Sequence, residues 1–187
     1  MNFFDDTIID KTSYSYQDLI GQPPIVTKIL ESSGNPAKGS SSPTQVYLGT
    51  TTGWQFAVGD SVYYQINVPL DWYPNGTFTL ELHWYSSNTT ASRYIQWQVD
   101  WDSIGLGEVI TSPGSSGTIT SGDVLLSTTA NSLTETAMTS IAGNNIANND
   151  HITLKVSRIA SSGTAPAVGD NPVIIHMEVA YQAYGVK

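Results

Sequence analysis

Apolar and polar residues alternate with period two along the middle of the chain, between residues 54 and 101. The apolar positions form three runs: Val62, Tyr64, Ile66 and Val68; Phe78, Leu80, Leu82 and Trp84; Ile95, Trp97, Val99 and Trp101. Such alternation is typical of β-strands with one buried face. It predicts three adjacent strands of one antiparallel sheet, with Trp84 and Trp97 in the core between two layers.

Further runs of the same kind lie on either side of this stretch, at 46–49 before it and at 124–129, 133–141, 151–159 and 173–186 after it. In the run 151–159, Arg158 falls in register with the apolar positions. The turn-rich stretch from 104 to 123 predicts at most a short strand, and no window predicts a helix longer than about three turns. About eight strands separated by Gly, Pro and Asn turns favour an all-β fold, an antiparallel β-sandwich of jelly-roll type.

Residues 1–44 differ from the rest, because short apolar clusters precede a run rich in Gly, Ser and Pro. We therefore expect an extended N-terminal arm and linker over 1–44 and a β-sandwich domain over 45–187. The arm either lies along its own domain or packs on a neighbouring subunit. Since its apolar clusters have no obvious place in an eight-stranded sandwich, we expect a homo-oligomer, with a trimer favoured. The expected interface residues are Phe3, Phe4, Ile8, Ile9, Trp72 and Tyr73.

The composition limits the classes of partner. The net charge is −9, the sequence pI is near 4.4, and the seven basic residues are scattered. A phosphate-binding surface needs clustered Lys and Arg, so nucleic acid and anionic membrane are not the expected partners. The chain has no cysteine, which excludes disulfides and thiolate metal sites. No stretch approaches the roughly 18 apolar residues of a membrane helix, and no basic, then apolar, N-terminal pattern predicts a secretory signal.

Two pairs of residues raise the question of a metal site. Glu81 and His83 share one face of their predicted strand, and His176 and Glu178 share one face of the last strand. If the two strands are neighbours, these side chains meet, and imidazole with carboxylate suits zinc. The other interpretation is a polar outer face with ordinary cross-strand pairs, and it is the one we expect.

Acidic residues near the third run allow two further hypotheses. Asp100, Asp102 and Glu108 could form a glycosidase carboxylate pair. The same residues could hold Ca²⁺, and so could a loop of oxygen-bearing side chains, Asn144, Asn145, Asn148 and Asp150. There is no EF-hand spacing and no G-x-S-x-G elbow. We therefore expect no catalytic activity, no cofactor and no required metal.

Three segments resemble virion proteins of tailed bacteriophages. The segment from Trp54 is similar to a "W-x-F-x-x-G-D" start whose second strand closes on "H-x-H-W". The segments 141–159 and 171–185 are similar to that group's central loop, strand and Arg element and to its final strand. The resemblance covers roughly residues 45–187. The first His of the pair is Glu81 here, so only His83 is kept.

The resemblance implies a virion structural protein on the head surface or in a tail or fibre. The first hypothesis is a non-enzymatic capsid decoration or cement protein that clamps the major capsid protein and neighbouring copies of itself. The alternative is a tail or fibre receptor-binding module that uses exposed aromatic side chains to bind host glycans. A short chain without a fibre-shaft repeat or coiled coil favours the first.

Overall fold

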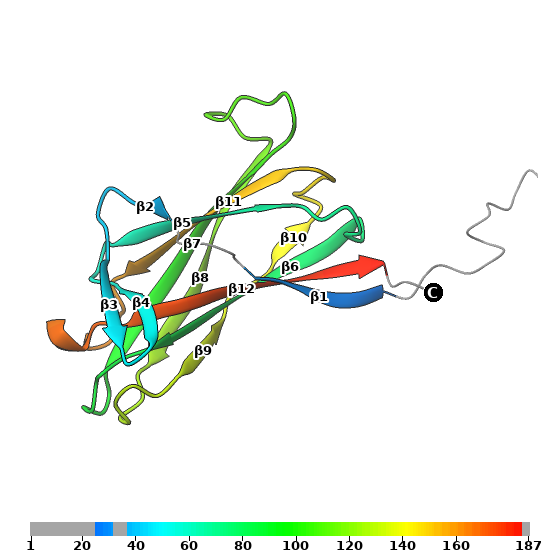
Figure 1. The fold of residues 1–187 in the computed structure, drawn as a ribbon. Helices are drawn as coiled ribbons and strands as arrows, with labels where there is room; N and C mark the ends of the chain where they lie inside the picture. Colours follow the sequence, from blue (N-terminus) through cyan, green and yellow to red (C-terminus); the bar gives the residue numbers. More distant parts are fainter. Residues whose placement is uncertain (1–24, 32–36, 185–187) are drawn as a thin grey trace, which may run out of the picture.

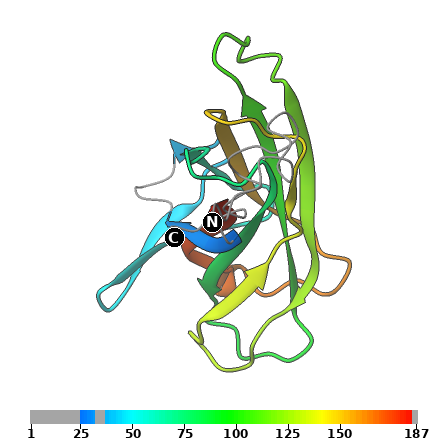
Figure 2. The same cartoon turned by 90° about the vertical axis from the view of Figure 1, so that its right-hand side faces the viewer.

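The protein is an all-β sandwich of two antiparallel sheets (Figures 1 and 2). The computed structural model describes residues 25–31 and 37–184. One sheet has five strands in the order β2 (Ala37–Lys38), β5 (Ser61–Asn67), β11 (His151–Ile159), β7 (Tyr94–Ile104) and β8 (Ser115–Leu125). The fold class predicted from the sequence, an antiparallel jelly-roll-like sandwich, is confirmed.

The second sheet has seven strands. Its main order is β10 (Ile141–Gly143), β6 (Asn75–Tyr85), β12 (Val173–Tyr184), β4 (Thr51–Gln55) and β3 (Thr44–Leu48). Two further strands join its long members: β1 (Ile25–Glu31) pairs with β12, and β9 (Thr134–Ala137) pairs with β6. Within the described residues the helical content is one 3₁₀ turn, η1 (Val168–Asp170).

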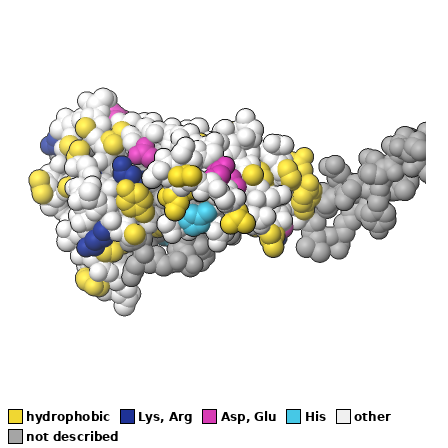
Figure 3. Space-filling model, turned by 90° about the horizontal axis from the view of Figure 1, so that it is seen from above, with side chains coloured by type: hydrophobic (Ala, Val, Ile, Leu, Met, Phe, Trp, Pro, Cys, Tyr) yellow, Lys and Arg dark blue, Asp and Glu magenta, His cyan; other side chains and the backbone are white. Residues whose placement is uncertain are grey.

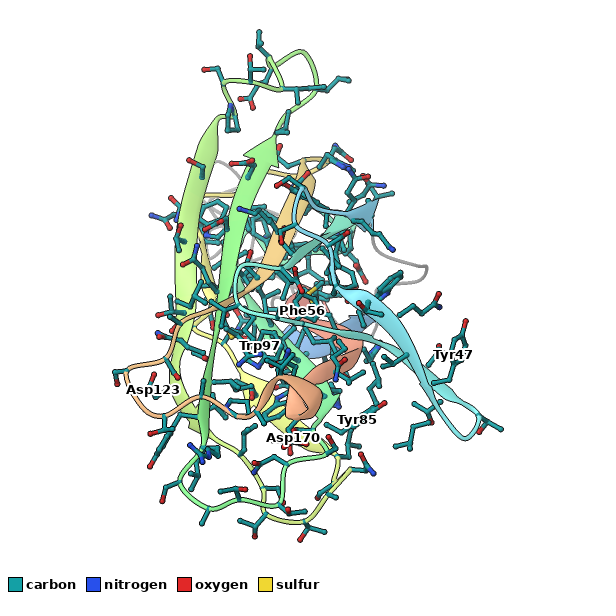
Figure 4. All side chains as sticks on the ribbon, turned by 90° about the vertical axis from the view of Figure 1, so that its left-hand side faces the viewer. Tyr47, Phe56, Tyr85, Trp97, Asp123 and Asp170 are labelled. Atoms are coloured by element: carbon teal, nitrogen blue, oxygen red, sulfur yellow. The ribbon has the colours of Figure 1, made fainter. Side chains whose placement is uncertain are left out.

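The core lies between the two sheets and follows the predicted faces. All twelve apolar positions of the three runs are buried, and so is Arg158. Trp84 and Trp97, expected in the core, are 1% and 0% exposed and come from opposite sheets, with ring centroids 6.2 Å apart. The ring of Phe56 meets Trp97 edge-on at 5.5 Å (Figure 4). Burial of such aromatic side chains is the main stabilising contribution in a domain with few charges.

The expectation that the three alternating runs form one sheet is wrong. β6 belongs to the seven-stranded sheet, whereas β5 and β7 belong to the five-stranded sheet, where β11 lies between them. Consecutive strands therefore cross from one layer to the other. Alternation identifies the buried face of a strand, and it does not identify the strand that pairs with it.

The expectation of at most a short strand between residues 104 and 123 is also wrong. β8 has 11 residues and pairs with β7 along its length, at the edge of the five-stranded sheet. Its sequence is Ser, Thr and Gly with few apolar residues, so it lacks a hydrophobic signal. Gly117 is needed there, since a Cβ atom would come within 2.9 Å of the Trp101 indole.

Part of the expected arm lies on its own chain. β1 pairs antiparallel with β12 from Ile25 opposite Tyr184 to Glu31 opposite Glu178. The Lys28 ammonium donates to the Asp71 carboxylate, which also accepts from the Tyr181 hydroxyl at 3.0 Å. Residues 25–31 thus take the first of the two alternatives given for the arm, a strap along the same domain.

Candidate functional site

The loop that joins β7 to β8, residues 105–114, projects beyond the sandwich at the top of Figure 1. We call it the contact loop. Three of its side chains are apolar and open to solvent: Leu106, Val109 and Ile110 are 103%, 65% and 78% exposed. Exposed apolar side chains that gather on one projecting segment are typical of protein contact sites.

The contact loop is held in a defined shape by Glu108. One oxygen of its carboxylate accepts from the backbone N–H groups of Gly105 at 2.8 Å and of Gly114 at 3.0 Å. The Ser112 N–H donates to the Val109 carbonyl at 2.8 Å and closes the tip. A Cβ atom at Gly114 would lie 2.5 Å from the Glu108 carboxylate, so a larger residue there would displace that carboxylate. The apolar side chains are therefore displayed on an ordered loop, which lowers the entropy lost on binding.

A second apolar projection is the β3–β4 hairpin, with Tyr47 and Leu48 near its tip (Figure 4). These side chains are 71% and 42% exposed, and Gly49, at φ 60°, allows the tight turn that follows them. The hairpin and the contact loop extend in different directions from the body in both ribbon views (Figures 1 and 2). The two apolar projections are therefore separate surfaces.

The outer surface of the seven-stranded sheet carries a cluster of imidazoles and carboxylates. We call it the outer-face cluster; it comprises Glu81, His83, Glu135, His176 and Glu178. On β6, His83 lies opposite Glu135 of β9 and opposite His176 of β12, and Glu81 lies opposite Glu178. The His83 and His176 ring centroids are 5.6 Å apart. The meeting of the two residue pairs, anticipated from the sequence, is confirmed, and Glu135 joins them from a third strand.

The carboxylates of the outer-face cluster repel one another. The pKa of Glu81 is raised, first by partial burial and then by the neighbouring carboxylates of Glu135 and Glu178, while His83 acts in the opposite direction. The nearest contact of His83 with an acid is Nε2 to Glu178 Oε2, at 3.9 Å. That distance is too long for a hydrogen bond, and His83 Nε2 is buried without a hydrogen-bond partner.

Arg158 forms a buried polar corner on the other sheet. Its side chain is 2% exposed, and its Nη1 donates to the Phe56 carbonyl at 2.8 Å and to Asn171 Oδ1 at 2.5 Å. Burial lowers the pKa of Arg158, and the nearby Asp60 opposes that effect. Asp60 in turn accepts from the Ala57 N–H at 2.7 Å. The Phe, Gly and Asp of the W-x-F-x-x-G-D segment therefore build a structural corner around Arg158.

The structure places two of the expected interface residues. Trp72 was expected at the surface, but it is 3% exposed, because its ring packs against Phe78 and its Nε1 donates to the Gly76 carbonyl at 3.0 Å. Tyr73 is partly exposed and meets Tyr184 edge-on. The four remaining interface residues, Phe3, Phe4, Ile8 and Ile9, lie outside the described residues.

The acidic residues considered for catalysis or Ca²⁺ have structural partners. Asp100 accepts hydrogen bonds from Gln98 and Thr118 and pairs with Lys155 at 3.3 Å. Asp150 is 8% exposed and accepts from the Ser103 hydroxyl and the Ala147 N–H. Glu108 and Asp150 line one cavity of about 230 Å³, together with Asn144 and Asn145. Asp102 lies on the outer face of β7, the same face as Asp100, and is opposite Ser116 of β8.

Comparisons with known proteins find fold similarity only. No family model matches the chain, and no curated protein matches it. Among solved structures, a carbohydrate-binding module of family 36 in complex with calcium and xylotriose is 16% identical, with a TM-score of 0.42, over 81% of this chain and 97% of that one. The module of family 35 from Cellvibrio japonicus Abf62 is 12% identical, with a TM-score of 0.44, over 87% of this chain and 100% of that one.

A viral coat protein is similar to the same degree. The VP2 subviral particle of infectious bursal disease virus is 14% identical to this chain, with a TM-score of 0.46, over 88% of this chain. The chain spans only 34% of the VP2 chain. At these identities the likeness describes a shared β-sandwich and says nothing about what this chain binds. The described residues contain no helix long and apolar enough to span a membrane.

Proposed function

We propose that this chain is a non-enzymatic structural protein of a virion, a decoration or cement protein that stabilises a phage head by bridging capsid subunits. The observation that carries the proposal is the contact loop, which displays Leu106, Val109 and Ile110 on a backbone held by Glu108. An ordered loop with apolar side chains is suited to insertion between protein subunits. The sequence resemblance to virion proteins of tailed phages supports this setting.

The face of the molecule seen from above is compatible with a protein partner. In the view from above, hydrophobic side chains form separate patches among mostly uncharged polar ones, with few charged groups between them (Figure 3). The β3–β4 hairpin gives a second apolar contact away from the first. We propose the major capsid protein as the partner at the contact loop, and further copies of this chain, as a trimer, as the partners at its other edges.

The alternative, a receptor-binding module of a tail or fibre, depends on exposed aromatic side chains. Four of the five tryptophans are buried: Trp72, Trp84, Trp97 and Trp101. The fifth, Trp54, is partly buried, with the Lys38 ammonium 4.9 Å from its ring centroid. Stacking on sugar rings needs an open aromatic face. The burial of the tryptophan rings removes them as sugar-stacking platforms, which leaves Tyr47, 71% exposed, as the open aromatic side chain on which the alternative depends.

The proposal is tested by adding the protein back to particles stripped of it. Wild-type protein should rebind and raise the temperature at which the particles open, because it binds the assembled lattice and not free subunits. The double variant Leu106→Ser/Ile110→Ser should need at least about tenfold more protein for half occupancy, since two anchors are lost.

Leu70→Ser is the matched control, because Leu70 is 87% exposed but lies outside the contact loop and the hairpin. It should rebind like the wild type. Equal occupancy by the double variant would overturn the assignment of the loop. If stripped particles open at the same temperature but no longer adsorb to cells, and the protein binds on a glycan array, the alternative replaces the cement proposal.

A further inference from the structure

The outer-face cluster has the donor atoms of a metal site. In Glu81, His83 and Glu135, one ligand atom of each side chain lies within 4.8 Å of the others. A tetrahedral zinc ion with ligands at about 2.1 Å needs donors about 3.4 Å apart. Closing that difference requires rotation of these side chains, of which Glu135 is exposed and Glu81 and His83 are partly exposed. His176 and Glu178 lie opposite His83 and Glu81 on the neighbouring strand.

A β-bulge gives the last strand its part in the cluster. The pairing of β12 with β6 shifts between Ile174, which lies opposite Trp84, and His176, which lies opposite His83. Ile175 is the extra residue, so the alternation changes phase: Ile174 and Met177 face the core, while His176 and Glu178 face outward. Bulges of this kind re-aim side chains next to functional sites.

The carboxylates of the cluster also lack a Lys or Arg partner within the described residues. These three carboxylates lie close together, and none of the ion pairs that Lys or Arg forms within the described residues reaches them. His83 Nε2 is one of four buried side-chain atoms of the described residues without a hydrogen-bond partner, and the other three, Trp97 Nε1, Ser157 Oγ and Arg158 Nε, lie outside the cluster. Buried polar atoms in folded proteins are almost always satisfied, and each exception calls for an explanation. A metal ion would supply both the positive charge and the missing partner of the nitrogen.

We propose that Glu81, His83 and Glu135, assisted by His176 or Glu178, bind one divalent transition-metal ion, with zinc preferred. The imidazole nitrogen selects against Ca²⁺ and Mg²⁺, which take oxygen ligands. Bound metal would join the four-residue edge strand β9 to β6 and β12 and so fix one border of the sheet. This inference goes beyond the proposed function and differs from the expectation, drawn from the sequence, that no metal is required.

The test uses the full chain without an affinity tag, since tag histidines bind the same metals. Titration with ZnCl₂ after treatment with a chelator should show one ion per chain, and Co²⁺ should give the visible absorption of a tetrahedral site. His83→Ala should weaken zinc binding at least about tenfold, as should Glu135→Gln, whose exposed position makes misfolding a poor explanation. The melting temperature should rise with zinc in the wild type and not in these variants.

His151→Ala is the matched control, because His151 begins a strand of the other sheet, where its Nδ1 contacts Asn67 Oδ1 at 2.9 Å. This variant should keep the wild-type affinity. The proposal is overturned if the untagged wild type binds neither Zn²⁺ nor Co²⁺ saturably at micromolar concentration. It is equally overturned if His83→Ala and Glu135→Gln bind zinc as tightly as the wild type, or if only His151→Ala weakens binding.

Discussion

The Arg158 corner and the outer-face cluster are two arrangements of charged side chains with opposite balance. At the corner, one cation is 2% exposed and is bound to the Phe56 carbonyl and Asn171, with Asp60 as the nearby opposite charge. In the cluster, three carboxylates and two imidazoles meet, and a buried ring nitrogen has no partner. At the corner the cation has one carboxylate nearby, whereas in the cluster three carboxylates have no Lys or Arg partner within the described residues.

The two arrangements differ in how far partners within the chain compensate for the charge. A buried charge persists in a stable protein when its partners compensate for lost hydration, and the corner meets that condition at Nη1 of Arg158, while its Nε is buried without a hydrogen-bond partner. Like charges held together do not stabilise the chain by themselves, and this imbalance is the basis of the metal site that we propose. By the same reasoning, the W-x-F-x-x-G-D segment, which carries Asp60, stabilises the fold.

The largest expected effect comes from breaking the corner. Arg158→Met should lower the free energy of unfolding by about 3–5 kcal/mol, because it leaves the Phe56 carbonyl and Asn171 without their donor and Asp60 without a nearby cation. Equilibrium denaturation in urea measures the change, provided that unfolding is two-state.

Lys155→Met is the control for removal of a cation from the same strand. Lys155 pairs with Asp100 at 3.3 Å, but its side chain is 38% exposed, so the loss should stay below about 1 kcal/mol. Equal effects of the two substitutions would show that the contacts of Arg158 contribute no more than an exposed ion pair. They would then contradict the comparison between the corner and the cluster.

A smaller effect of opposite sign is expected in the cluster. With a chelator present and at low salt, Glu81→Gln should stabilise the protein by roughly 0.2–1 kcal/mol, because it removes repulsion from Glu135 and Glu178. Added zinc should reverse the order and leave the wild type more stable. Asp100→Asn, which removes a carboxylate paired with Lys155, should not stabilise. Destabilisation by Glu81→Gln in the chelator would contradict the charge balance described above.

The sequence predicted the buried faces well because alternation is a local property. The three apolar runs, and even Arg158 in register with Ile152, Leu154 and Val156, point into the core as expected. Sheet membership was not predicted, since the pairing of β5 and β7 with β11 involves residues far apart in the chain. β8 was missed because an edge strand of Ser, Thr and Gly gives little apolar signal.

The candidate site was predicted in part for the same reason. Glu81 with Glu178, and His83 with His176, follow from period-two patterns on two long strands that happen to be neighbours. Glu135 lies on a four-residue strand whose pairing the sequence does not reveal. The bulge at Ile175 is equally hidden, because it changes the phase of the alternation within an apolar run. In the contact loop, apolar residues among glycines were a usable signal that was interpreted as turns alone.

The smallest and most local effect is expected at β1, which a surface tie holds to the sheet. The Lys28 ammonium, then the Tyr181 hydroxyl, lower the pKa of Asp71, against the opposing effect of burial. A carboxyl whose pKa is lower in the folded state adds stability above its unfolded value, near 3.8, and that stability is lost as the pH falls through the folded value. We therefore expect amide hydrogen exchange in residues 25–31, corrected for intrinsic rates, to be slow at pH 6 and faster below pH 4.

In the variant Asp71→Asn, residues 25–31 should exchange quickly at both pH values. Asp123→Asn is the control, because the pKa of Asp123 is also lowered, by Ser162, but Asp123 lies on β8 in the other sheet. Slow exchange of β1 in Asp71→Asn at pH 6 would show that the backbone pairing with β12 alone holds the strap. The pair of Lys28 and Asp71 at the surface would then contribute nothing to the stability of this fold, unlike the contacts of Arg158.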